Sequence, residues 1–88
     1  MIISKYDVVV IFGTGSYCDV TICQNDFCQI KDELVEKLGE FGGEICVTLN
    51  TISFTISGVE DEAYAEELET KLANIGGYLL ECLWGQEQ

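Results

Sequence analysis

The chain contains no histidine and no arginine, and its four lysines stand against sixteen acidic residues. Without histidine, a cysteine nucleophile has no imidazole to act as its base, which argues against this common form of covalent catalysis. The formal net charge of −12 makes the surface repel nucleic acid and anionic membranes and attract basic surfaces. We therefore expect no direct binding of nucleic acid and no membrane association, although acidity can also serve solubility alone.

Patterns of metal ligands are missing as well. The five cysteines are odd in number and contain no C-x-x-C pair, which fits neither a disulfide framework nor a zinc site. No loop carries the ligand spacing of a calcium site. Free thiols are the simplest interpretation, with Cys18, Cys28 and Cys82 in the core and Cys23 and Cys46 exposed. The sequence predicts neither a metal nor a cofactor.

Long apolar runs are also absent. The apolar segment at residues 1–12 is too short to cross a bilayer, and it contains Asp7. No small-residue cleavage site follows it, as would be expected after a signal peptide. We expect a cytoplasmic protein, located in the cytoplasm of the host cell if a phage encodes it.

The glycine-rich segment at residues 13–16 (GTGS) is the one motif that invites a phosphate-binding interpretation. It follows a strand pattern, but no lysine lies nearby, and the next residues alternate like a strand instead of forming a helix. Carboxylates are frequent, yet on solvated helix faces no burial shifts their pKa values toward those of catalytic acids. We interpret the segment as a turn and expect no enzymatic activity.

One stretch of twelve residues occurs twice in similar form. Residues 32–43 (DELVEKLGEFGG) and 66–77 (EELETKLANIGG) share six identical positions at an offset of 34. The apolar positions before them, 18, 20 and 22 in one case and 52, 54 and 56 in the other, match at the same offset. Either a strand and an amphipathic helix ending in Gly-Gly have been duplicated, or two helices reached the same ending independently.

Apolar periodicity predicts the elements of secondary structure. Spacings of three and four residues indicate amphipathic helices, whereas alternation indicates strands. The expected strands are at residues 6–12, 17–23, 45–49, 51–57 and 78–84. The first helix is expected to be capped by Asn25 or Asp26 and ended by Gly42-Gly43. The second helix is expected to start at Ser57 or Gly58 and to be ended by Gly76-Gly77, and residues 85–88 are expected to form a tail. The first two strands are expected to pair as a hairpin, and so are the next two, which turn near Asn50.

These elements predict one α+β domain over residues 1–88. We expect a two-layer sandwich in which both helices cover one face of a mostly antiparallel five-stranded sheet, in the order ββαββαβ. Without its first strand this order becomes βαββαβ, so a ferredoxin-like variant is the second choice of topology. The open face of the sheet is expected to hold Val9, Ile11, Leu79 and Leu83.

The two helices carry most of the acidic residues. Ten acids less three lysines give them about half the negative charge that duplex DNA carries over the same length of about 20 Å. Pairing of Glu33 with Lys37 and of Glu67 with Lys71 would reduce this excess. The candidate partner-binding residues are Asp32, Glu33, Glu36 and Glu40 on the first helix and Glu62, Glu66, Glu67 and Glu69 on the second. A basic nucleic-acid-binding protein or nuclease complex is the expected partner.

In size, acidity, lack of catalytic motifs and compact α+β pattern, the chain resembles phage-encoded anti-CRISPR and anti-restriction proteins. This resemblance implies an inhibitor that mimics DNA and occupies the nucleic-acid-binding surface of a basic protein. No residue motif supports it, so it implies no site residues. An acidic immunity protein or antitoxin is the nearest alternative. A different class is a small regulatory or subunit module that forms a homodimer through its open sheet face and binds a ligand or a larger enzyme.

Overall fold

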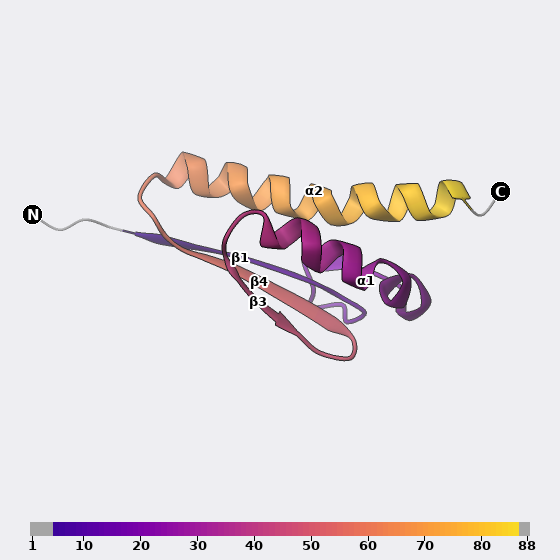
Figure 1. The fold of residues 1–88 in the computed structure, drawn as a ribbon. Coiled ribbons are helices and arrows are strands. Elements are labelled where there is room, and N and C mark those ends of the chain that lie inside the picture. Colours follow the sequence, from indigo (N-terminus) through magenta and orange to yellow (C-terminus); the bar gives the residue numbers. More distant parts are fainter. Residues whose placement is uncertain (1–4, 87–88) are drawn as a thin grey trace, which may run out of the picture.

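The computed structural model describes residues 5–86, which form a mixed four-stranded sheet and two helices (Figure 1). The elements are β1 (Tyr6–Gly13), β2 (Val20–Thr21), α1 (Gln24–Gly39), β3 (Glu44–Val47), β4 (Thr51–Val59) and α2 (Glu62–Gln86). The strands lie in the order β2-β1-β4-β3. Strand β1 is antiparallel to β4, and β4 is antiparallel to β3, whereas β2 is a two-residue segment parallel to β1.

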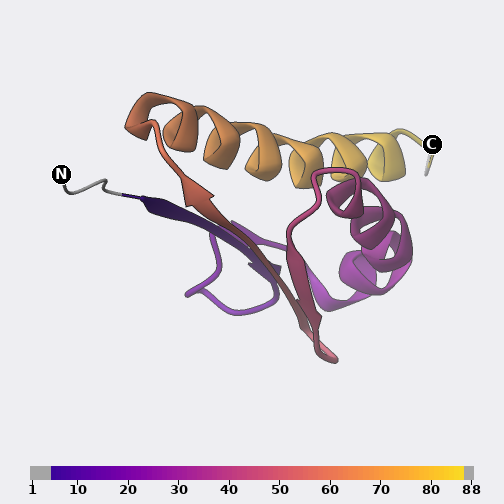
Figure 2. The same ribbon diagram turned by 60° about the vertical axis from the view of Figure 1, so that its left-hand side comes forward.

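Both helices lie on the same face of the sheet (Figure 2), as the sequence predicted. Helix α2 lies over β1 and reaches β2, while α1 packs beside α2 over β3 and β4. The α+β class is therefore confirmed. The prediction of five strands in the order ββαββαβ is wrong, because the described chain has four strands in the order ββαββα and its second helix is not followed by a strand. For the same reason the ferredoxin-like order βαββαβ is not found. Two of the three strand pairs are antiparallel.

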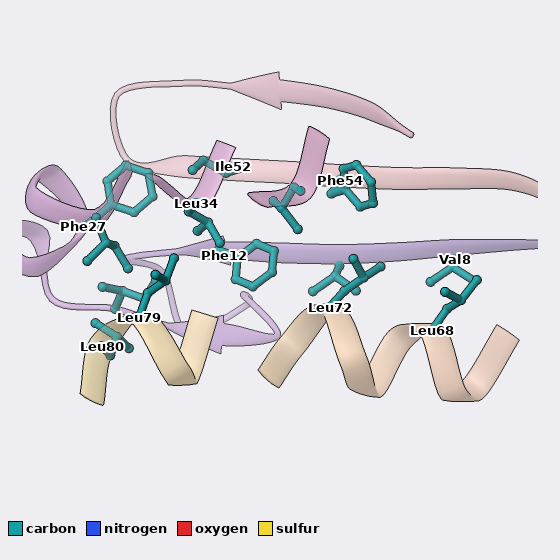
Figure 3. Close-up of a cluster of buried hydrophobic side chains, with 14 of the residues drawn as sticks. Val8, Phe12, Phe27, Leu34, Ile52, Phe54, Leu68, Leu72, Leu79 and Leu80 are labelled. Atoms are coloured by element: carbon teal, nitrogen blue, oxygen red, sulfur yellow. The ribbon is translucent and has the colours of Figure 1, made fainter. Parts of the chain in front are cut away.

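The hydrophobic core fills the space between the sheet and the two helices (Figure 3). Alternate residues of β1 and β4 face the helices, and residues of each helix at spacings of three and four complete the layer. The fully buried side chains are those of Val10, Phe12, Ile22, Phe27, Leu34, Leu38, Ile52, Phe54 and Leu72. No charged or polar residue is buried among the described residues, so the acids are confined to the surface.

The strand expected at residues 78–84 is helical, because α2 continues without a break through Gly76 and Gly77. A Cβ atom at Gly76 would lie 2.9 Å from the buried ring of Phe12, so glycine lets the helix approach β1 closely. This glycine is therefore required by packing and does not end the helix. Leu79 and Leu80 then face the core instead of the open side of the sheet. In the expected tail, Gly85 and Gln86 belong to α2, and residues 87–88 lie outside the described residues.

The first Gly-Gly pair follows the end of α1 after a short turn and does not itself end the helix. Helix α1 ends at Gly39, and Gly42 adopts a φ of +78°, which glycine tolerates better than other residues. Each half of the chain thus contains a strand followed by a helix on the same sheet face. The two strands, β2 and β4, nevertheless lie on opposite sides of β1, and β2 is parallel to β1 whereas β4 is antiparallel to it. Only α1 ends near its Gly-Gly pair.

The hairpin expected between residues 6–12 and 17–23 is also wrong. After Gly13 the chain loops out and returns, so that β2 pairs with β1 in parallel. The backbone N–H of Ile11 donates to the Asp19 carboxylate (2.8 Å), and the N–H of Ile22 donates to the carbonyl of Gly13 (2.7 Å). Because the Asp19 side chain binds the edge of β1, a backbone ladder cannot continue past β2. The alternation seen in residues 17–23 buries Cys18 and Ile22 without forming a long strand.

The helix starts also differ from the expectation. Helix α1 begins after Cys23, which makes no side-chain cap, and Asp26 instead accepts a hydrogen bond from the indole N–H of Trp84 (3.1 Å). Strand β4 extends to Val59, and the carboxylate of Asp61 caps α2 by accepting the N–H of Ala63 (3.0 Å). The bond between Trp84 and Asp26 joins the end of α2 to the start of α1. The β3-β4 hairpin turns near Asn50, as predicted.

Substitutions at the two neighbouring glycines of α2 should have opposite effects on stability. Gly77→Ala should stabilise the protein by up to about 1 kcal/mol, because nothing lies within 4 Å of the added Cβ and alanine favours helix. Gly76→Ala should destabilise it by about 1–2 kcal/mol, because the clash with Phe12 outweighs the same helical gain. Urea denaturation of both variants provides the comparison. Equal stabilisation by both substitutions would contradict a close approach of α2 to β1.

Candidate functional site

All eight acids that the sequence selected are exposed, but they do not form a single layer. With 3.6 residues per turn, the three residues Glu62, Glu66 and Glu69 lie on one flank of α2. The residues that line the contact with α1, among them Lys71 and Ile75, lie on the opposite flank. The three glutamates therefore face away from α1. We call these three residues the outer acidic row.

The other acids of α2 extend or leave this row. Glu60 and Asp61 immediately precede the helix and are exposed beside its N-terminus, where the helix dipole favours negative charge. Glu67 points to the α1 side and forms a salt bridge with Lys71 (3.7 Å). This pair agrees with the expected i,i+4 pairing, and it is the only salt bridge found within residues 5–86. Since Lys71 lies across the helix from the outer acidic row, the row has no lysine of its own helix beside it.

The acids of α1 are dispersed over several surfaces. Asp32 lines an open cleft of about 880 Å³ between α1 and the β3-β4 turn, together with Lys31. Glu33 lines a smaller hollow between the helices and does not reach Lys37, so that expected pair is absent. Glu36 is exposed on α1, and Glu40 is exposed immediately after the helix ends at Gly39. These four acids thus lie on different surfaces around α1, and none of them extends the outer acidic row on the far flank of α2.

Two of the four lysines gather in the groove between the helices. Lys37 and Lys71 line a hollow of about 420 Å³ whose walls include Phe41, Ile75 and Tyr78. A side-chain hydrogen bond to Cys82 and the Cys82 charge raise the pKa of Tyr78 above its usual value, with a smaller contribution from Glu33. Because Lys37 and Lys71 both lie in this groove, they compensate acids on the α1 side of α2. The uncompensated negative charge of α2 lies on its other side.

The free edge of β1 lies beside this uncompensated flank. Helix α1 covers the β3-β4 side of the sheet, whereas α2 contacts β2, and a Cβ added at Gly76 would lie 3.5 Å from Val20. The outer flank of α2 therefore faces the β2 side of β1. On this side β2 pairs only with Phe12 and Gly13. Asp7 and Val9 are exposed on β1, and 43% of Val9 is accessible. A carboxylate within an otherwise apolar strand pattern indicates the edge of a sheet. This signal could have identified Asp7 as an edge residue from the sequence.

The cysteines form no common site. Cys18 is buried and Cys23 and Cys46 are exposed, as predicted, but Cys28 and Cys82 are exposed and the prediction of core positions for them is wrong. Both lie on helix surfaces beside the groove walls rather than in the apolar stripes. Within residues 5–86 no group of three or more potential ligands is placed to hold a metal ion.

Comparisons of the chain with protein-family models, with curated proteins and with solved structures find no match. Neither of the described helices contains an apolar stretch of the length that crossing a membrane requires. Function is therefore inferred from the charge and geometry of the chain itself.

Screening by salt should stabilise the protein. With a net charge of −12 and one exposed salt bridge among the described residues, repulsion between acids exceeds attraction in the folded state. The melting temperature should rise between about 10 mM salt, where the Debye length is about 30 Å, and about 0.15 M, where it is about 8 Å. Differential scanning calorimetry provides the measurement. A flat or falling melting temperature would show that the acids are locally paired.

Proposed function

We propose that the protein is a small inhibitor that binds a basic nucleic-acid-binding protein and blocks its nucleic-acid-binding surface. The observation that supports this function best is the segment from Glu60 to Glu69, which contains six acids and no lysine. Lys71 neutralises one of them, Glu67, which leaves five. Over the corresponding length of about 15 Å, duplex DNA carries about nine phosphates. The segment therefore has more than half the charge density of DNA.

The way in which this charge is presented also favours a rigid binding surface. Asp61 caps the first turn of α2, and Leu68 and Leu72 anchor the helix to the core, so the acids project from a fixed support (Figure 3). Preorganised charges lose less entropy on binding than charges on a flexible tail. A basic groove that binds phosphates is the complementary surface, and long-range attraction would accelerate the encounter. An anti-CRISPR or anti-restriction protein and an acidic immunity protein would both act in this way.

A second candidate function is supported by the open face of the sheet. No described element covers this face, on which the exposed Val9 and the half-buried Ile11 lie beside Ser53 and Thr55 of β4. Leu79 and Leu83 are absent from it, because they belong to α2. The remaining apolar area suits a regulatory or subunit module that dimerises through its sheet. The charge of −12 on each copy opposes this association. Sedimentation equilibrium distinguishes the two candidate functions, because the inhibitor is expected to be a monomer and the module a dimer.

Charge reversal on the outer acidic row should abolish inhibitor binding selectively. Proteins captured from a host lysate at low salt are identified, and a captured nucleic-acid-binding protein is then used for titration. Glu62→Lys, Glu66→Lys and Glu69→Lys together should weaken its binding by about 2–5 kcal/mol. The matched control reverses the same number of charges on α1, with Asp32→Lys, Glu36→Lys and Glu40→Lys, and should have a much smaller effect.

Two further observations complete this test. Duplex DNA should compete with the inhibitor for the captured protein, and the affinity should fall steeply as salt increases. Far-UV circular dichroism should show both triple variants folded, because exposed substitutions usually change stability by about 0.5 kcal/mol or less. If the α2 variant binds as tightly as wild type, or if DNA does not compete, the proposed function is wrong.

A further inference from the structure

The direction of the backbone groups on β1 follows from two hydrogen bonds. The N–H of Ile11 points away from β4, since it donates to Asp19, and the carbonyl of Gly13 points the same way, since it accepts from Ile22. Successive residues of a strand direct their backbone groups to alternate sides. The N–H and C=O groups of Asp7 and Val9 therefore also point away from β4. Within residues 5–86 these four groups have no hydrogen-bond partner.

The position of neighbouring elements leaves room for one more strand at this edge. Strand β2 reaches only as far as Phe12, and the Asp19 carboxylate closes the edge at Ile11. Helix α2 packs against β1 over the sheet face on which Val8, Val10 and Phe12 are buried. Among the described residues, the region beside Asp7 and Val9 is therefore bounded at one end by Asp19 and has no strand at the other. An exposed strand edge of this kind is a template for strand addition.

The charges around the edge select the chemistry of the added strand. Side chains of such a strand would point alternately to the helix side and to the open side of the sheet. On the helix side they would lie beneath the outer acidic row, which suits lysine or arginine. On the open side their neighbours on β1 would be Val9 and Asp7, which suit an apolar residue and a further basic residue.

We infer that the edge of β1 at Asp7 and Val9 binds an extended segment of a basic partner by strand addition, with the segment's basic side chains facing the outer acidic row. This inference rests on the proposed function, because it specifies how the basic partner is held. Backbone hydrogen bonds align the segment, and the glutamates select its charge. A second copy of this chain is a poorer occupant, because pairing β1 with β1 would bring two outer acidic rows together.

A synthetic peptide of alternating valine and lysine provides a direct probe. In two-dimensional NMR of the full chain at low salt, the peptide should shift the amide signals of Asp7 and Val9 and slow their hydrogen exchange. A control peptide with proline in place of valine keeps every lysine but cannot form a strand ladder, and it should bind at least about tenfold more weakly. Protection at these two amides distinguishes strand addition from general attraction to the acidic surface.

Substitution of Val9 tests the edge in the protein itself. Val9→Pro removes an N–H that makes no bond to β4, and proline is tolerated where a strand N–H faces solvent. Peptide binding should weaken about tenfold or more, whereas Val9→Thr, which keeps the N–H, should change it by less than about twofold. Circular dichroism establishes that the proline variant is folded. If it is not, the amide protection measured on the wild-type protein decides the question alone.

The outcomes separate this inference from the proposed function. If the lysine variant of the outer acidic row loses the captured partner but the peptide leaves Asp7 and Val9 unprotected, the edge inference is overturned and the inhibitor function stands. If the peptide protects both amides but the lysine variant still binds the captured protein, the edge inference stands and the inhibitor function fails. A concentration-dependent dimer that protects the same amides without peptide would assign the edge to a second copy and overturn the inference.

Discussion

The close packing of α2 against β1 determines most of this structure. Gly76 brings the helix axis near the ring of Phe12, and the helix then continues to Gln86 because Leu79 and Leu80 find core positions beyond the crossing. The residues that would otherwise form a last strand are thereby used in the helix. Consequently no described strand lies along the outer edge of β1 beyond the short β2.

The same packing divides the charges of α2 into two flanks. One flank meets α1, where Lys37 and Lys71 line the groove and Glu67 is paired. The other flank carries Glu62, Glu66 and Glu69 above the β1 edge. Within residues 5–86, this protein of net charge −12 thus places carboxylates without a salt bridge beside backbone groups without a hydrogen bond. Electrostatic attraction and strand pairing act at one place, which favours a basic and extended partner over a folded acidic one.

Secondary structure could be predicted correctly from the sequence where the local apolar pattern agrees with the tertiary packing. The apolar stripe of Phe27, Ile30, Leu34 and Leu38 identified α1, and the alternation around Ile52 and Phe54 identified the β3-β4 hairpin. Both helices were also correctly placed on one sheet face. The exposure of all eight candidate acids followed from the same periodicity, although their separation into different flanks required the positions of the helices relative to each other.

The predictions from sequence were wrong where one residue type occurs in two different structural settings. In the first Gly-Gly pair, Gly42 turns the chain after α1 with a positive φ, whereas in the second pair Gly76 permits close packing within α2, and only the position of Phe12 distinguishes the two cases. The spacing of Leu72, Leu79 and Leu83 contained the signal for a continued helix. Cys28 and Cys82 lie close in sequence to apolar positions yet one step around the helix from them, which exposes both.

Amide hydrogen exchange of the unbound protein can test both the free edge of β1 and the continuity of α2, because it reports each backbone amide separately. We expect slow exchange at Val8, Val10 and Ile11, fast exchange at Asp7 and Val9, and slow exchange through residues 76–82 as in one continuous helix. Slow exchange at Asp7 and Val9 in a monomer, or fast exchange beginning at Gly76, would contradict this expectation.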